Sequence, residues 1–305
     1  MDRPGDLIVL TAGAWRLRAP LACSSYGTLW RADDAASGAP AALKLVNRAQ
    51  MDAAPPALRR HWRDGADAER DFLQTLRPWD GRHIVRLLDH GRHHGCAALA
   101  LELLDGDLKT HLDARERRLG TRAVPFAQAL AWTAQVNAAL ARVHGYGWRH
   151  LDLKPANLLI DARSGTLKLA DFGTCRPLQD GVHGYGGTAG WQAPEQCVPA
   201  NAGPDASYRT DARADYFALG LLLYRLVTGV PLRGADADTP NVFNPDEAGL
   251  FLRAAGAHDG AARAAALGLL RALLARSPGD RPAHAPAISR LIAAARAASA
   301  CLEAA

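Results

Sequence analysis

The chain has 305 residues, of which 49% are hydrophobic and 22% are charged, and its formal net charge is +5 at pH 7. This composition is ordinary for a soluble globular protein, and the length is long for one core and short for two independent domains. A membrane span is excluded, because the best apolar run, Phe217–Val227, contains Arg225 and is shorter than the roughly 18 residues required. The basic excess is small and no RNA-binding motif accompanies it, so we expect no nucleic-acid partner.

The first third of the chain predicts a strand-rich region. Short apolar runs alternate there with turn residues, between Trp15 and Val46 and again after residue 84. The expected strands include residues 27–30 and 42–46, with a turn at 33–40 between them, and then 84–89 and 97–103. Pro55 and Pro56 precede a predicted helix that ends near Pro78.

The rest of the chain predicts mainly helices. Pro125 opens a helix with one apolar face, which ends at Gly145 or Gly147. A hairpin of residues 158–160 and 167–170 follows, and then an apolar helix over 215–228 that Gly229 stops. After a polar loop expected at 233–247, two Ala- and Leu-rich helices complete the chain, the first ending near residue 276 and the second starting at about 287.

Cysteine usage and the first residues bear on location. The five cysteines form no C-x-x-C pair, which favours a reducing compartment, and MDRPGD is not a signal peptide. We therefore expect a cytoplasmic protein, and the abundance of Ala and Arg suggests a bacterial source. Arginines and histidines cluster at residues 59–94. This cluster is either a docking face for an acidic partner or a solvated helix face, and we favour the second.

Residues 149–161, RHLDLKPANLLID, form the most informative motif. Asp152 is followed by Asn157 and, nineteen residues after Asp152, by Asp171-Phe172-Gly173. Phosphoryl transfer from a metal-bound nucleotide requires one carboxylate to orient the accepting hydroxyl, and an amide oxygen and a second carboxylate to hold Mg²⁺. With Ala193-Pro194-Glu195 downstream, the chain resembles the eukaryotic-like protein kinase family, and the DLKPAN loop resembles its Ser/Thr branch.

This resemblance implies ATP and Mg²⁺ (or Mn²⁺) as cofactors and Ser or Thr hydroxyls of proteins as acceptors, with autophosphorylation. It implies that Asp152 orients the hydroxyl and Lys154 neutralises the transferred phosphoryl group. Asn157 and Asp171 would bind the metal ion. Thr188, in the Gly-Thr-x-x-Trp element at 187–191, would bridge Asp152 and Lys154 and favour Ser or Thr as acceptor.

The nucleotide side of the predicted site depends on Lys44 and Glu69. Lys44 lies in an apolar strand, where the resemblance implies that it holds the α- and β-phosphates. The resemblance implies that Glu69 pairs with Lys44 from a helix and orients it. A helix is expected there because Leu73 and Leu76 follow Glu69 with the spacing of an inward apolar face. The other implied nucleotide contacts are a roof of Leu21, Leu29 and Ala42, a floor of Leu159, Leu101 as gatekeeper, Glu102 and Leu103 in the hinge and Asp107 near the ribose.

Two motifs depart from the family pattern. In the glycine-rich loop at 22–29, Gly27 is the one pattern glycine present, and Ala22 and Ser24 occupy the other two positions. Their Cβ atoms hinder close approach to the phosphates, so we expect weakened ATP binding. The usual His-Arg-Asp becomes His-Leu-Asp, and Leu151 cannot pair with a phosphorylated residue. We therefore expect activity that does not depend on phosphorylation of the activation loop, which the resemblance places at residues 174–192 (the activation segment).

The expected fold is α+β, the bilobal protein-kinase fold. A small antiparallel-β N-lobe with one long helix would occupy residues 1–104, with a hinge at 102–106, and a larger, mainly α C-lobe residues 105–305. The resemblance also implies a Glu195–Arg281 ion pair and capping of the catalytic loop by Asp215. A nucleotide-binding pseudokinase scaffold remains an alternative, and a small-molecule phosphotransferase is a weaker one. The sequence predicts no membrane partner and does not indicate the oligomeric state.

Overall fold

We describe the chain from a computed structural model, which covers residues 2–23, 27–179, 183–184, 187–197, 207–232, 243–257 and 260–300. The chain divides into two compact units. The first contains residues 1–105 and 170–175, and the second contains residues 106–169 and 176–305. Within the described residues, no helix is long and apolar enough to cross a membrane.

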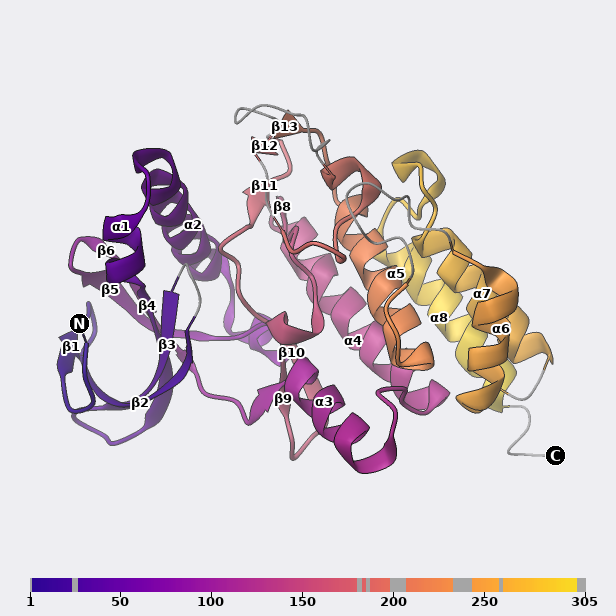
Figure 1. Cartoon of the computed structure of the whole chain (residues 1–305), viewed down its shortest axis with the longest axis horizontal. Helices are drawn as coiled ribbons and strands as arrows, with labels where there is room; N and C mark the ends of the chain where they lie inside the picture. The colour runs from indigo at the N-terminus through magenta and orange to yellow at the C-terminus, as the bar shows by residue number, and fades with distance from the viewer. Residues whose placement is uncertain are drawn as a thin grey trace. The chain divides into compact units, whose positions relative to one another are not determined.

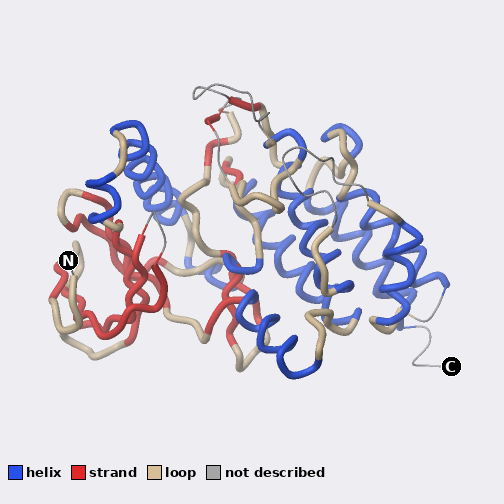
Figure 2. The backbone as a smooth tube through the Cα atoms, in the orientation of Figure 1, coloured by secondary structure: helices blue, strands red, loops and turns tan. Residues whose placement is uncertain are grey.

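The first unit is built on a six-stranded antiparallel sheet with the order β1-β2-β3-β4-β6-β5 (Figures 1 and 2). Its strands are β1 (Leu7–Val9), β2 (Ala14–Cys23), β3 (Gly27–Asp34), β4 (Pro40–Val46), β5 (Leu87–His93) and β6 (Cys96–Glu102). The short helices are α1 (Arg48–Ala53) and the 3₁₀ helix η1 (Pro78–Arg82). The long helix α2 (Pro56–Thr75) contacts β5 and β6.

The two faces of this sheet carry different residues. One face holds a buried apolar cluster that includes Trp15, Leu17, Trp30, Leu43 and Leu45. Register pairs Leu29 with Lys44 and Lys44 with Leu99, and it pairs Ala42 with Leu101. Because side chains alternate between faces along a strand, these partners share the opposite face. The sheet therefore presents Lys44 among the residues expected to contact the nucleotide.

The second unit is mainly helical (Figures 1 and 2). Its helices are α3 (Leu108–Leu119), α4 (Phe126–Gly145), α5 (Arg213–Thr228), α6 (Pro245–Ala254), α7 (Gly260–Leu273) and α8 (Ala285–Ala300), with the 3₁₀ helices η2 (Pro155–Asn157), η3 (Pro194–Gln196) and η4 (Pro278–Asp280). The short strands are β7 (Gly106–Asp107), β8 (Trp148–Arg149), β9 (Leu158–Asp161), β10 (Thr166–Leu169), β11 (Arg176–Pro177), β12 (His183–Gly184) and β13 (Ser207–Tyr208).

Helix α5 lies at the centre of this unit. It contacts α4, α6 and α7, and nearly every residue along it is buried, which is why its sequence is apolar on all sides. Gly229 ends the helix in the left-handed conformation with φ of 78°, as the sequence predicts. The buried Asp215 lies in its first turn. The helix therefore holds a charged group deep inside the unit.

Two expected boundaries are wrong. The strand expected from residue 84 begins at Leu87, because the carbonyl of Asp80 accepts the N–H groups of His83 and Ile84 and holds them in a turn. The polar loop expected at 233–247 ends earlier, because α6 begins at Pro245 after the Asn244 side chain accepts the N–H groups of Asp246 and Glu247. Residues 233–242 of that loop lie outside the described part.

Candidate active site

In the first unit, Lys44 lies between two carboxylates. Its Nζ is 2.6 Å from Glu69 Oε2 and 2.7 Å from Asp171 Oδ1. The other carboxylate oxygen of Glu69 accepts the Phe172 N–H at 3.1 Å. Glu69 in α2 therefore orients both the lysine of β4 and the backbone that carries Asp171. Asp171 has a φ of 61°, a conformation that non-glycine residues rarely adopt and that is often found at functional sites.

Burial and charge oppose one another at this ion cluster. Burial by itself would lower the pKa of Lys44, but the charges of Asp171 and Glu69 outweigh it and raise the pKa above its ordinary value. Burial raises the pKa of Glu69, although the nearby Lys44 opposes this effect. The lysine is therefore held as a cation, and about half of the Asp171 side chain is exposed. In this arrangement Lys44 is suited to bind a phosphate group, and Asp171 is suited to bind a metal cation.

Close packing holds Asp171-Phe172-Gly173 against α2. The rings of Phe72 and Phe172 have centroids 4.4 Å apart. A Cβ atom added to Gly65 would lie 2.8 Å from the carbonyl oxygen of Gly173. Gly65 is not among the predicted site residues, although a glycine inside a helix, one turn before Glu69, indicates a close approach of two backbones.

The other predicted nucleotide residues of the first unit lie on the sheet or just after it. Ala42 and Leu101 are buried, whereas Leu21 is 46% exposed. The side chain of the predicted hinge residue Glu102 is bound by Arg86. Its carboxylate accepts the backbone N–H of Arg86 at 2.9 Å and the side-chain Nε–H of Arg86 at 3.1 Å. Leu103 follows β6 and is partly buried. In the glycine-poor loop, Ala22 is exposed and Gly27 begins β3, while Ser24 lies outside the described residues.

In the second unit, Asp215 holds the catalytic loop. Its carboxylate accepts the N–H of His150 at 2.8 Å and the N–H of Leu151 at 2.7 Å, as expected. His144, at the end of α4, also contacts it at 2.8 Å, a contact that sequence analysis missed. Burial alone would raise the pKa of Asp215, but the contacts with the two histidines outweigh burial and lower it. Leu151 is held at a φ of 66°.

This support positions Asp152. Lys154 Nζ is 2.7 Å from Asp152 Oδ2 and 2.5 Å from Thr188 Oγ1, so the lysine joins the loop to the activation segment. The expected bridge by Thr188 therefore differs in the structure: Lys154 joins Asp152 and Thr188, and Thr188 itself makes no hydrogen bond with Asp152 among the described residues. The other oxygen, Asp152 Oδ1, is buried and has no hydrogen-bond donor among the described residues. A buried carboxylate oxygen without a partner is costly, and a substrate hydroxyl would satisfy it.

Asn157 is oriented by the same aspartate. Its Nδ2 donates to the backbone oxygen of Asp152 at 2.9 Å and to Asp152 Oδ2 at 3.1 Å. The amide oxygen is therefore the remaining ligand atom, and an oxygen donor fits Mg²⁺. Of the other predicted residues in this unit, Leu159 is partly buried in β9. Asp107 caps α3, because its carboxylate accepts the N–H and the hydroxyl of Thr110.

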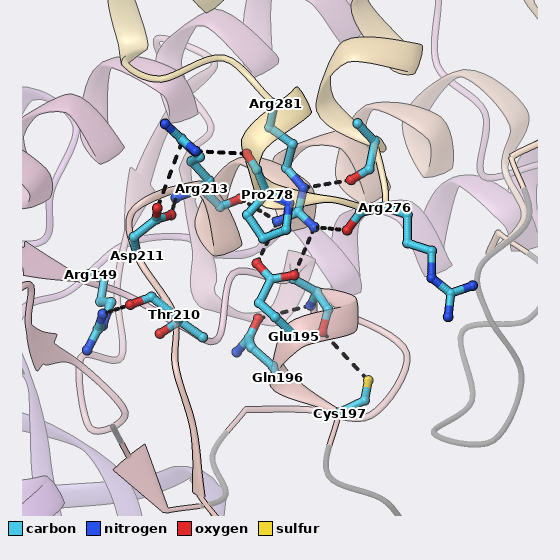
Figure 3. A network of polar contacts seen from close by, with 12 residues as sticks. Arg149, Glu195, Gln196, Cys197, Thr210, Asp211, Arg213, Arg276, Pro278 and Arg281 are labelled. Carbon is cyan, nitrogen blue, oxygen red and sulfur yellow. Dashed lines mark hydrogen bonds and ion pairs between the residues drawn. The ribbon is translucent and has the colours of Figure 1, made fainter. Parts of the chain in front are cut away.

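A buried ion pair supports the end of the activation segment (Figure 3). Arg281 Nη1 lies 2.6 Å from Glu195 Oε1, and its Nη2 lies 2.8 Å from Glu195 Oε2, as expected from the sequence. Arg281 also donates to the carbonyl groups of Arg213, Ala275 and Arg276. The neighbouring Gln196 donates to the carbonyl of Leu151 at 3.1 Å. This second link is not among the predicted contacts, because nothing in the local sequence pattern indicates it.

Comparison with known proteins agrees with this geometry. The family model described as "Protein kinase domain" matches residues 23–291, which is most of the chain. The chain belongs to the protein kinase family. A Ser/Thr-protein kinase from Streptomyces coelicolor, PkaA, is 34% identical over 226 residues, covering 70% of this chain and 39% of that protein. Cyclin-dependent kinase F-1 from rice is 37% identical over 197 residues, covering 61% of this chain and 40% of that protein.

Solved kinase structures show the same fold. The PknI kinase domain of Mycobacterium tuberculosis superposes with a TM-score of 0.64 and 26% sequence identity, and the match covers 97% of this chain and all of that one. The chain thus has the α+β protein-kinase fold, with an antiparallel N-lobe sheet and a helical C-lobe. The chain spans roughly two fifths of the length of PkaA and of cyclin-dependent kinase F-1.

Proposed function

We propose that this kinase transfers the γ-phosphoryl group of ATP·Mg²⁺ to Ser and Thr hydroxyls of proteins, including its own. The observation that carries the proposal is the arrangement at Asp152: one carboxylate oxygen is bound to Lys154, and the other is buried without a donor among the described residues. A lysine–carboxylate pair made only for stability would not require an orphaned oxygen. Asp152 can thus orient a hydroxyl, and Lys154 can stabilise the charge on the transferred group.

The two lobes predicted from the sequence have different roles in this proposal. Residues 1–104 form the ATP-binding lobe, in which Lys44, fixed by Glu69, binds the α- and β-phosphates. Residues 105–305 form the catalytic lobe. Bound Mg²⁺ would neutralise the phosphate charges, and Asn157 and Asp171 are the residues that would hold it. Since the side chain and the N–H of Glu102 are engaged by Arg86, we expect the backbone of Leu103 to make the hinge contact with adenine.

A transfer assay with radiolabelled ATP tests this function. We expect Asp152→Asn to reduce phosphoryl transfer at least 100-fold, while ATP·Mg²⁺ still raises the melting temperature of the variant. Asp161→Asn, which changes an aspartate that caps a turn after β9, is the matched control and is expected to remain active. If Asp152→Asn retains wild-type activity, the assignment is wrong. If the wild type binds ATP but transfers nothing, the pseudokinase alternative, which the glycine-poor loop favours, replaces the proposal.

We further propose that activity does not require activation-loop phosphorylation. Leu151 is buried, its N–H is bound by Asp215, and its carbonyl accepts Gln196. A Cβ atom on Gly187 would lie 2.8 Å from the same carbonyl, so the activation segment packs directly on it. Arg149 is fully buried and donates to the carbonyl of Thr210 (Figure 3), so it is not exposed to a phosphate. Neutral contacts therefore replace an arginine–phosphate pair.

Phosphatase treatment tests this second proposal. We expect dephosphorylated enzyme carrying Thr174→Ala to keep kcat within about twofold of the wild type, because no arginine of the catalytic loop is placed to bind a phosphate. Gln196→Ala removes the neutral link and is expected to lower kcat. Loss of activity on dephosphorylation, with Gln196→Ala unaffected, would contradict the reasoning. We also propose a cytoplasmic location, on the basis of the cysteine pattern alone.

A further inference from the structure

The second unit contains a cavity of about 620 Å³ beside Asp152. Lys154, Pro155 and Ala156 of the catalytic loop line it, together with Thr188–Trp191 of the activation segment. Since Lys154 also touches Asp152, a peptide whose hydroxyl reaches Asp152 must pass near this cavity. The rest of the lining comes from α3, α5 and the residues after α5, including Leu112, Leu221 and Leu232. An apolar wall with charged groups is typical of a pocket for a specific side chain.

The charges that line the pocket are mainly positive. Within the described structure they comprise four cations, Lys109, Arg122, Lys154 and Arg225, and one carboxylate, Asp113. Three of these cations are neutralised: Lys109 and Arg122 contact Asp113 at 2.7 and 3.0 Å, and Lys154 contacts Asp152. Arg122 also contacts Glu116 at 2.6 Å. The excess positive charge therefore belongs to Arg225.

Arg225 is partly buried in the last turn of α5, and no described residue forms a hydrogen bond or ion pair with its guanidinium. Burial, and then the charge of Arg122, lowers the pKa of Arg225, although the charges of Asp113 and Glu116 oppose this effect. A cation at a helix C-terminus is favoured by the helix dipole, but that effect does not require partial burial in a pocket. A partly desolvated guanidinium without an anion in direct contact is unfavourable, and a carboxylate offers it a bidentate partner.

We propose that this pocket binds an acidic side chain of the substrate, so that the kinase selects Ser or Thr near Asp or Glu, with Arg225 as the specificity-determining residue. This inference rests on the proposed kinase function. Charge complementarity carries it: the single carboxylate of the pocket is shared by Lys109 and Arg122, and Ala156 adds no charge, so nothing in the described pocket would hold a basic substrate residue.

Peptides that differ in one residue test the proposal. A serine peptide receives Asp, Asn or Lys at each flanking position in turn, and kcat/KM is measured. We expect Asp to exceed Asn at one or more positions by roughly ten- to hundredfold, the range of a charge-assisted hydrogen bond. Arg225→Gln should reduce this ratio to about one, Arg225→Lys should reduce it partly, and Arg225→Glu should favour Lys. Higher salt should weaken the preference of the wild type.

Arg271→Gln is the matched control, because Arg271 also lies in the last turn of a helix, α7, and does not line the pocket. It should keep the wild-type ratio. Absence of an acidic preference in the wild type, or a full preference in Arg225→Gln, would overturn the inference and leave the kinase function intact. If Arg225→Gln does not fold, the ratio for Arg225→Lys decides.

A peptide-binding measurement distinguishes failure of the kinase function from failure of the pocket proposal. If the wild type transfers phosphate to no peptide, fluorescence anisotropy with the labelled Asp and Asn peptides replaces kcat/KM. Tighter binding of the Asp peptide that Arg225→Gln abolishes supports the pocket even though catalysis has failed. Equal binding of the two peptides overturns the pocket together with the function.

Discussion

Gly65 offers a sharp test of how α2 and the Asp171-Phe172-Gly173 segment fit together. In an open helical position, replacing Gly by Ala stabilises a helix by about 1 kcal/mol. At Gly65 the new Cβ would lie 2.8 Å from the carbonyl oxygen of Gly173 and 3.7 Å from its carbonyl carbon. Both neighbours are backbone atoms, so relief requires a shift of the segment or of α2. Such overpacking costs about 1–3 kcal/mol.

Gly268 is the matched control. It lies inside α7, and a Cβ atom there would meet no other heavy atom within 4 Å. Gly268→Ala should therefore increase the free energy of unfolding by up to about 1 kcal/mol. The propensity gain is common to both variants, so the difference between them isolates the overpacking cost, and Gly65→Ala should be about 1–3 kcal/mol less stable than Gly268→Ala.

Urea denaturation measures both free energies, and steady-state kinetics measures the consequence for the site. A shift of the segment displaces Asp171, which is 2.7 Å from Lys44, and small displacements in an active site lower rates strongly. We expect kcat to fall at least tenfold in Gly65→Ala and to stay unchanged in Gly268→Ala. If Gly65→Ala is as stable and as active as Gly268→Ala, the close approach does not control the site.

Three further changes test other contacts. Glu195→Ala leaves the fully buried Arg281 guanidinium without its anion and should cost about 3–5 kcal/mol of unfolding free energy, measured by denaturation. Asp215→Asn should destabilise the protein at pH 7, and the difference from the wild type should shrink in acid. Folding lowers the pKa of Asp215, so the ionised carboxylate contributes to the free energy of unfolding at pH values above the ordinary aspartate range. That contribution is lost as the pH falls through the lower pKa of the folded protein. Lys44→Met should abolish the melting-temperature increase given by ATP·Mg²⁺.

Each of these changes has a control at a residue whose contact is exposed to solvent. Arg18→Ala breaks an exposed ion pair with Asp33 and should cost less than about 1 kcal/mol, so an equal cost for Glu195→Ala would contradict the role of burial. Asp161→Asn should show an acid dependence of the same sign but smaller size, since hydrogen bonds from Ser164 and Arg163 also lower the pKa of Asp161, but in an exposed turn. Lys109→Met should leave the ATP response intact, because that lysine pairs with Asp113 on α3.

Local sequence features predicted most elements of the fold. Alternating apolar residues and turns indicated β3, β4 and β6, Pro56 indicated the start of α2, and Gly229 indicated the end of α5. These signals are local because they arise from backbone sterics and from the side-chain periods of strands and helices. The missed start of α6 and the late start of β5 depend on capping and turn hydrogen bonds. Apolar periodicity does not report such bonds.

By itself, the sequence determined which residue types could perform the chemistry, because Asp152, Asn157 and Asp171 occur at spacings that few other functions require. The tertiary structure decided which of the candidates meet. Lys44 and Asp171 are 127 residues apart in sequence and 2.7 Å apart in space, and Gln196 reaches Leu151 across 45 residues. Arg225 is an ordinary helix residue in the sequence and becomes a pocket residue only through packing. Such contacts depend on how elements pack, and local propensity contains no record of that packing.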